Sequence, residues 1–423
     1  MKGSNYPLTE APELTISVES TYRRAIEVLR GNATQRGLKA SHAYYNQVWA
    51  RDAFISFLGA NLVQDAPLLQ SAKTTFDVFA KTRSPLGQIA NFYDLSTDSP
   101  EFGFSGSTDS SCWFVVGLAS LYYSTEDRSL LGAPLDAALD AYRFVRYQDA
   151  NNSWLIDSPQ GADWMDAAIQ RTGKTLYNNV LFLAATKCLL LLLSASGRPS
   201  DGTYLLDYDA LEERFTDVFL PGTDSVDRIS NYWPRLATHH REQRLVDKSK
   251  KYFLQYISFA RIDSHFDTLS NLLCVLSHVA ESETCDSILE TIRARQLTRP
   301  FPVRVLDPPY KRGEAGYDEN LDALLPIQHR SGQYDYHNGG VWPFVGGFYV
   351  CALNSFGRDA SAELEALARA NGVLRQGETV GFNEWLDGRK GEARGQYGQS
   401  WNAGMFIAAY LSSRGKDPLG FLS

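Results

Sequence analysis

Two acidic residues stand in settings that suit proton transfer to and from a substrate. Asp166 ends the segment 159–166 (PQGADWMD), and apolar surroundings of this kind hold a carboxyl group protonated near neutral pH. Glu384 lies in the aromatic-flanked segment 382–388 (FNEWLDG). Hydrolysis of a glycosidic bond with inversion needs one protonated carboxyl for the leaving oxygen and one carboxylate that activates water, about 6.5–9.5 Å apart. Asp166 and Glu384 are therefore candidates for such a pair of carboxyl groups.

Each of these two assignments has an alternative. Asp166 could simply cap a helix, as Asp readily does, and Asp163 is either a rival acid or a ligand for a sugar hydroxyl. Glu384 could instead be a surface residue paired with Arg389 or Arg394, because exposed ion pairs are common. The sequence leaves the choice between Asp163 and Asp166 open.

Further polar and aromatic residues gather just before apolar stretches, and we expect them to bind a sugar through ring stacking and hydrogen bonds to hydroxyls. They are Arg51, Asp52, Asp109, Trp113, Asp163, Trp164, Asn179, His337, Asn338, Trp342, Gln399 and Trp401. For the adjacent Arg51 and Asp52 the alternative is a buried pair that ties helices together. Asp109 could be a helix cap, and for Trp113 a place in the core is favoured. His337 is expected to bind a hydroxyl and not to transfer the key proton.

Hydrophobic periodicity predicts the elements that must position these groups: about twelve helices and few strands. Six predicted helices are amphipathic, at 17–31, 67–81, 135–148, 208–219, 283–295 and 360–372. Six are apolar nearly all round, at 52–63, 109–123, 179–194, 266–280, 339–354 and 401–412. The two kinds alternate, which predicts an all-α (α/α)6 barrel with a buried inner ring and an amphipathic outer ring. A solenoid is the alternative, but no short repeat recurs at a fixed period.

The organisation of the chain also predicts where the site lies. No composition break or linker interrupts residues 1–423, so we expect a single catalytic domain. The polar clusters precede the apolar helices, at 44–52, 87–94, 105–113, 159–166, 334–342, 382–388 and 395–401. If the inner helices run parallel, all of these loops open into one cavity, which is the default place for an active site.

Composition excludes several other classes of function. The formal net charge is −8 without a long basic block, so nucleic acid is not an expected partner. The motifs of metal and nucleotide sites are missing, and we expect no metal and no cofactor. The polar N-terminus lacks a secretory signal, which predicts a cytoplasmic location. Five scattered cysteines are expected to be reduced core residues.

The sequence also bears on membranes and assembly. The most apolar stretch, Val180 to Leu193, is too short for a bilayer, which takes about 20 apolar residues. We therefore expect a buried helix there and no membrane partner. A homo-oligomer stays open.

At the polar clusters the sequence resembles the alkaline/neutral invertases and, more distantly, the glucosidase domain of glycogen debranching enzymes. The invertase likeness is strongest in YFLQYISFARIDSHFDTLSNLLCVLS (252–277), RPFPVRVL (299–306), YHNGGVWP (336–343) and NEWLDGRKGEARGQYGQSWNAG (383–404). The debranching likeness is strongest in WARDAFISFLG (49–59), STDSSCWF (107–114) and DWMDA (163–167). These motifs occur in the same order as in the two families and span most of the chain, so together they indicate the resemblance far more specifically than any one motif alone.

Both families imply an (α/α)6 barrel and inversion at the anomeric carbon. The invertase-like pattern places the acid at an Asp separated by six residues from a Gly, here Asp166 and Gly173, and the base at the Glu of NEW, here Glu384. The families usually carry a Glu two residues before the position of Asn179, where this chain has Tyr177. Debranching enzymes carry a further N-terminal domain, so a barrel alone is expected to suit a small glycoside better than a branched polymer.

These implications lead to three hypotheses. The first is an inverting glycoside hydrolase that removes a terminal α-glucosyl residue from a small α-glucoside, with sucrose as the foremost candidate. The second is a debranching-type amylo-α-1,6-glucosidase acting on short oligosaccharides. The third is a sugar-binding barrel without catalysis. A phosphorylase is disfavoured because no phosphate-cradling loop is evident.

Overall fold

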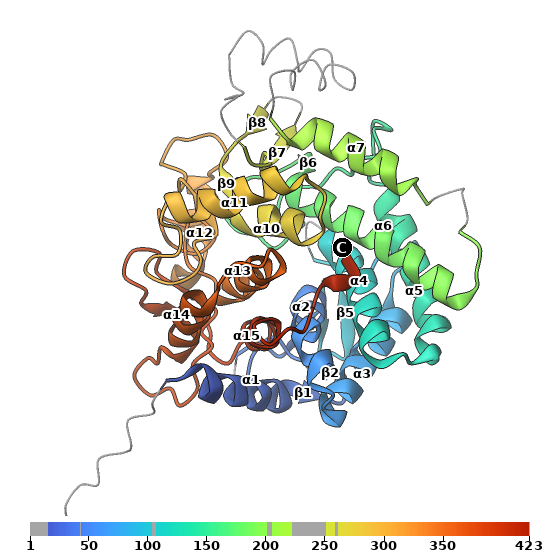
Figure 1. The fold of residues 1–423 in the computed structure, drawn as a ribbon, viewed down its shortest axis with the longest axis horizontal. Helices are drawn as coiled ribbons and strands as arrows, with labels where there is room; N and C mark the ends of the chain where they lie inside the picture. The colour runs from blue at the N-terminus through green and yellow to red at the C-terminus, as the bar shows by residue number, and fades with distance from the viewer. Residues whose placement is uncertain are drawn as a thin grey trace, which may run out of the picture.

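The structure, a computed structural model, is dominated by helices arranged in two concentric rings (Figure 1). It describes residues 16–42, 44–103, 107–200, 205–221, 251–258 and 261–422. The chain alternates between the rings as it proceeds, beginning with an outer helix, so that each outer helix precedes an inner one. The predicted (α/α)6 barrel is confirmed.

The inner ring consists of the helices that are apolar nearly all round. They are α2 (Ala50–Ala60), α4 (Asp109–Thr125), α6 (Leu176–Ser196), α10 (Thr268–Leu276), α13 (Pro343–Ser355) and α15 (Ser400–Ser412). Each packs against the next in this order, and α15 packs against α2, which closes the ring. A solenoid would leave its first and last helices apart. The closed ring therefore identifies the fold as a barrel and excludes the solenoid.

The closing contact between α2 and α15 depends on two glycines. A side-chain carbon at Gly404 would collide with the backbone of Ser56, and one at Gly59 would collide with the carbonyl oxygen of Gly404. The two helices can therefore approach this closely only without side chains at these positions. The first and last inner helices are thus joined backbone to backbone.

The outer ring consists of the amphipathic helices, which turn one apolar face inward. They are α1 (Val18–Asn32), α3 (Ala66–Thr82), α5 (Ala133–Arg146), α7 (Tyr208–Phe219), α11 (Ser282–Ala294) and α14 (Ser361–Gly372). Three of them begin with a side-chain cap: Ser17 for α1, Asp65 for α3 and Asp207 for α7. The described residues also contain a short helix that the periodicity does not predict, α12 (Glu319–Leu324).

Short strands lie at the end of the barrel where the inner helices begin. They are β1 (Ala33–Thr34), β2 (Gly37–Leu38), β3 (Gln47–Trp49), β4 (Phe92–Asp94), β5 (Ser99–Glu101), β6 (Lys174–Thr175), β7 (Tyr256–Ser258), β8 (Arg261–Asp263), β9 (Phe266–Asp267), β10 (Leu306–Asp307), β11 (Trp385–Leu386) and β12 (Ala393–Arg394). Their antiparallel ladders have the orders β1-β2, β3-β4-β5, β6-β7-β8, β10-β9 and β11-β12. Strands β3, β6 and β9 lead directly into α2, α6 and α10, so these ladders fix the loops at this end.

The last described residues pack at the opposite end of the barrel. The turn η4 (Gly420–Leu422) packs against α4 and α6. Phe421 stacks on Tyr123 near the end of α4, and the carbonyl of Leu422 accepts a hydrogen bond of 2.9 Å from Lys187. These contacts cover part of the barrel end where the inner helices finish.

Helix α6 is longer than the apolar stretch that marked it in the sequence. With 21 residues it has the length and composition of a membrane span, but 67% of its most apolar window is buried inside the protein. The argument from length is thus wrong, whereas the expectation of a buried helix is confirmed. All five cysteines are also buried and unpaired, in agreement with a core of reduced thiols.

Candidate active site

A polar and aromatic cavity of about 400 Å³, counting the space open to solvent, lies at the start of the inner helices. Nine of the fourteen residues expected at the site line it: Arg51, Asp52, Trp164, Asp166, His337, Trp342, Glu384, Gln399 and Trp401. Ala40, Tyr45, Trp49 and Tyr336 complete the lining.

The architecture explains why residues so far apart in sequence meet here. Arg51 and Asp52 lie in the first turn of α2, and Trp401 lies in the first turn of α15. Trp342 and Gln399 are the residues just before α13 and α15. Because the inner helices begin at the same end of the ring, these side chains and the adjoining loops converge on one space, as expected.

Asp166 presents its carboxyl group to the cavity. The side chain is exposed to that space, while protein surrounds it on its other sides. Loss of hydration raises the pKa of Asp166 to about 6; the Arg51 charge opposes this rise, and the charges of Asp163 and Asp109 add to it. A carboxyl with such a pKa is protonated in about one molecule in ten at pH 7, far more often than an ordinary aspartate, and general acid catalysis requires this protonated form.

Glu384 is buried at 5% exposure, in the segment that leads into β11. Its carboxylate accepts hydrogen bonds from the Tyr45 hydroxyl (3.2 Å) and the Gln396 backbone N–H (3.0 Å). Burial nevertheless raises the pKa of Glu384 to about 7; the two hydrogen bonds oppose this, and the charges of Asp52 and Asp166 reinforce it. Its surroundings thus couple it to the other carboxyl groups of the cavity.

The arginines considered as surface partners of Glu384 interact with other groups. Arg394 forms an ion pair of 2.7 Å with Glu392, and the Arg389 guanidinium lies 4.6 Å above the ring of Tyr334. Glu384 is therefore a cavity residue.

Arg51 and Asp52 form the buried pair that was the alternative expectation, and both side chains also line the cavity. Arg51 pairs with Asp109 at 3.2 Å and lies 3.6 Å from Asp52. Burial raises the pKa of Asp52 to about 7; Arg51 lowers it, and Asp166 and Asp109 raise it. The cavity therefore brings together three carboxyl groups, those of Asp52, Asp166 and Glu384, each with a raised pKa.

Seven buried polar atoms of the lining residues have no hydrogen-bond partner within the described part of the chain. They are Nε1 of Trp49, Trp164 and Trp401, Nε of Arg51, Oδ2 of Asp52, Nδ1 of His337 and Nε2 of Gln399. The Arg51 and Asp52 atoms form an ion pair with each other at 3.6 Å, which leaves five atoms without a polar partner. A buried polar group without a partner is destabilising by about 1–3 kcal/mol, so these five atoms suit a ligand rich in hydroxyl groups.

His337 lies within the aromatic part of the wall. Its ring packs against Trp164 and Trp342, with centroids 5.1 Å away in each case. Burial and the nearby charges of Arg171 and Arg51 lower the pKa of His337 well below its ordinary value. The imidazole is therefore neutral, which suits a hydrogen-bonding role.

Five expected site residues lie behind the cavity wall. Asn338 bonds the backbone of Tyr310 and Ser331, and Asn179 bonds the backbone of Ile156 and Thr175. Trp113 is 1% exposed, and its indole N–H donates a hydrogen bond of 2.9 Å to the Tyr177 hydroxyl. Asp109 forms an ion pair with Arg51 and accepts a hydrogen bond from the Ser107 hydroxyl. Asp163 forms an ion pair with Arg171. In this structure these side chains support the wall from behind.

Sequence reasoning missed three lining residues with functional side chains: Tyr45, Trp49 and Tyr336. All three stand in the polar clusters that were recognised at 44–52 and 334–342. The sequence shows that these residues belong to polar clusters, but it does not show which side chains of a cluster point into the cavity.

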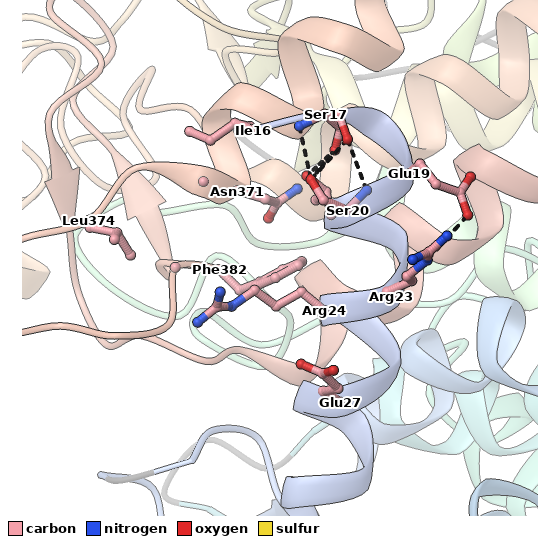
Figure 2. A pocket seen from close by; sticks show the side chains of 13 residues that line it. Ile16, Ser17, Glu19, Ser20, Arg23, Arg24, Glu27, Asn371, Leu374 and Phe382 are labelled. Atoms are coloured by element: carbon pink, nitrogen blue, oxygen red, sulfur yellow. Dashed lines mark hydrogen bonds and ion pairs between the residues drawn. The ribbon is translucent and has the colours of Figure 1, made fainter. Parts of the chain in front are cut away.

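A wider groove of about 930 Å³ lies elsewhere, between the start of α1 and residues 371–382 (Figure 2). Its four charged side chains, Glu19, Arg23, Arg24 and Glu27, all come from one outer helix, and Arg23 pairs with Glu19. It therefore lacks the facing carboxyl groups of the cavity. Among the described residues, no group of three or more His, Cys, Asp or Glu side chains is arranged to hold a metal.

The two concentric rings of helices, with convergent carboxyl groups and an aromatic cavity at one end, define a protein of the (α/α)6-barrel class. The chain belongs to the amylo-α-1,6-glucosidase family, whose model matches residues 21–408.

Similar proteins agree with this classification. A probable alkaline/neutral invertase F of Arabidopsis thaliana is 27% identical over 177 residues, which are 41% of this chain and 34% of that protein. A mitochondrial neutral/alkaline invertase 1 of Oryza sativa subsp. japonica is 23% identical over 88% of this chain and 64% of that protein. The chain thus spans only about one to two thirds of the length of these relatives.

Solved structures share the fold at low sequence identity. A GH63 mannosylglycerate hydrolase from Thermus thermophilus superposes with a TM-score of 0.63 at 14% identity, covering 92% of this chain and 99% of that one. A bacterial glucoamylase complexed with acarbose has a TM-score of 0.61 at 13% identity, covering 95% and 57%.

Proposed function

We propose that this protein removes a terminal α-glucosyl residue from a small α-glucoside by an inverting mechanism, with sucrose as the first candidate. The observation that carries the proposal is the cavity itself, where Asp166 and Glu384 face the same space as a set of unpartnered hydrogen-bonding atoms. The names of the invertase relatives support the choice of sucrose.

In the proposed reaction Asp166 donates its proton to the glycosidic oxygen while Glu384 removes a proton from the attacking water. The bond from the anomeric carbon to the leaving oxygen breaks as the bond to the water oxygen forms on the opposite face. The products are glucose and the free alcohol, and the two carboxyl groups exchange protonation states, which solvent then restores. Trp164, His337 and Trp401 contact the sugar.

The resting pKa values have a consequence for this mechanism. Since the pKa of Glu384 is about 7 and that of Asp166 is about 6, the shared proton resides mostly on Glu384 before substrate binds. The reactive arrangement, with the proton on Asp166, then makes up about one tenth of the singly protonated pairs. A bell-shaped pH dependence still results, because both limbs report the coupled pair.

Substrate comparison tests the proposal. The purified protein is incubated with sucrose, trehalose, isomaltose and branched limit dextrins, and NMR records the sugar released and its first-formed anomer. β-Glucose from sucrose is the expected result. Release of α-glucose first would indicate a covalent intermediate and would contradict the inverting mechanism.

A second candidate function is amylo-α-1,6-glucosidase activity on short oligosaccharides, which the description of the matching family favours. Glucose release from the dextrins alone would replace sucrose with this activity. Sugar binding without turnover across a broad pH range would instead leave a non-catalytic barrel.

We also propose a cytoplasmic location. One relative is named cytosolic invertase 1, of Oryza sativa subsp. japonica, and another relative is named mitochondrial. Fractionation of the source cells tests this proposal. Recovery of the protein in the cytosolic fraction is expected, and recovery in the organelle fraction would contradict it.

A further inference from the structure

A fully buried arginine lies under the loop that carries Asp166. Arg171 is 1% exposed. Its Nε and Nη2 donate to Oδ1 of Asp163 at 3.2 and 2.8 Å, and its Nη1 donates to Oδ2 of Asp267 at 2.5 Å. Its guanidinium also lies 5.5 Å above the ring of Tyr177. A buried charge is stable only when it is paired and hydrogen-bonded in this way.

The two carboxylates that hold Arg171 belong to different parts of the fold. Asp163 accepts a hydrogen bond of 2.8 Å from the Met165 backbone N–H, which shapes the turn immediately before Asp166. Asp267 caps the inner helix α10 by accepting from the N–H and the hydroxyl of Ser270. Arg171 therefore fastens the turn before Asp166 to the wall of the barrel.

We propose that Asp163 and Arg171 are positioning residues, which hold the Asp166 carboxyl at the cavity wall and set the balance of charge around it. This proposal rests on the proposed function, in which Asp166 supplies the proton. It gives Asp163 a role behind the wall, where it contacts Arg171 instead of the substrate.

The charged and titratable groups that act on Asp166 come from every side of the cavity. Arg51 and Asp52 belong to α2, Asp109 to α4 and Asp163 to its own loop, while Glu384, Tyr45 and Tyr336 face it from other loops. Arg51 lowers the pKa of Asp166, and Asp163 is the first of the charges that raise it. Arg171 in turn partly offsets the Asp163 charge, since the two are in direct contact.

Two substitutions separate charge from geometry. Asp163→Asn keeps an oxygen that can accept from Met165 but removes the negative charge, so the pKa of Asp166 should fall by about 0.5–1 pH unit. Arg171→Lys keeps the positive charge but loses the forked geometry. It should leave the pKa of Asp166 nearly unchanged while kcat falls by about tenfold, because a misplaced donor reacts slowly.

A matched control tests whether any buried ion pair in this region has the same effect. Asp149 has a fully buried side chain that pairs with Arg146 and Lys174, so Asp149→Asn also removes a buried carboxylate. It should lower Tm without moving the pKa of Asp166 or reducing kcat beyond about twofold.

The readouts are the ¹³C-carboxyl NMR titration of labelled Asp166, identified with an Asp166→Asn variant, together with kcat and Tm for every variant. An unchanged or raised pKa in Asp163→Asn overturns the charge role, and unchanged kcat in Arg171→Lys overturns the positioning role. Equal effects in Asp149→Asn would mean that Asp163 and Arg171 contribute only to the stability of the fold. The titration needs no turnover, so it still decides the charge role if the wild-type protein hydrolyses none of the tested glycosides and the proposed function fails.

Discussion

The hydroxyl of Tyr45 donates a hydrogen bond of 3.2 Å to Oε1 of Glu384, across 339 positions of the chain. The pKa of Tyr45 is raised above its ordinary value, chiefly by burial and by the Glu384 charge, so the phenol keeps its proton. The bond therefore always favours the ionised form of Glu384 and lowers its pKa. This contact bears directly on the proposed general base.

Replacing Tyr45 should move the alkaline limb of the pH–activity profile. In Tyr45→Phe the carboxylate loses one donor, so the pKa of Glu384 rises. Because the pKa of Glu384 already lies above that of Asp166, Glu384 sets the upper limb of the coupled pair, and that limb shifts upward by up to about 1 pH unit. The profile of kcat/KM against pH measures this. The neighbouring Tyr44 is 59% exposed, and Tyr44→Phe is the matched control with an unchanged profile. A downward shift in Tyr45→Phe would show that another group controls this limb.

Removing either proton-transfer group should nearly abolish turnover. Asp166→Asn and Glu384→Gln preserve side-chain volume but not the ability to exchange protons, so each should lower kcat by roughly 10²- to 10⁴-fold while the protein remains folded. Glu392→Gln, at an exposed carboxylate, serves as the control. Steady-state kinetics and circular dichroism report the two effects, and near-normal turnover in either variant rejects that residue.

His337 should contribute binding and no proton. In His337→Ala the substrate loses a hydrogen-bonding partner in the wall, which should reduce kcat/KM by roughly 10- to 100-fold. Since burial keeps the imidazole neutral, neither limb of the pH profile should move by more than the experimental error. A limb that disappears in this variant would make His337 a proton carrier instead.

Asp52 should affect stability in a pH-dependent way. Folding raises its pKa from an ordinary 3.8 to about 7, so the folded protein binds more protons than the unfolded chain between these values, and its contribution to stability is lost as pH rises toward 7. Asp52→Asn removes that loss. It should raise Tm at pH 8, by roughly 1–3 °C, and change it little at pH 5.

Scanning calorimetry at the two pH values measures this difference. Asp77→Asn is the control, because the side chain of Asp77 is 60% exposed. A lower Tm for Asp52→Asn at pH 8 would mean that the ion pair with Arg51 outweighs the burial of the carboxylate.

The helices were predictable because each ring has its own pattern of polarity. Segments such as Asp109–Thr125 and Ser400–Ser412 are apolar on all sides, and only a position in the inner ring buries every face. The strands were not predictable, because two or three residues, as in Trp385–Leu386, are too few to show an alternation. Their pairing depends on neighbours distant in sequence, such as β6 with β7.

The candidate site was predictable as a set of loops but not residue by residue. Polar clusters before buried helices indicate where a cavity opens, and Asp166 and Glu384 both lie there. Asn338 comes from one of these clusters and Asn179 from the first turn of α6, yet the amides of both bond backbone groups behind the wall. Composition does not distinguish these outcomes, because the backbone geometry of each loop sets the direction of the side chain.

The closure of the ring also determines when the cavity can exist during synthesis. Helix α15 completes the barrel by packing on α2, and Glu384 meets Tyr45 only when the last tenth of the chain has left the ribosome. Until then the apolar faces of the earlier inner helices lack their final neighbours and are exposed to aggregation. Enzymatic activity in a translation mixture should therefore appear abruptly with full-length product, whereas helical content accumulates earlier.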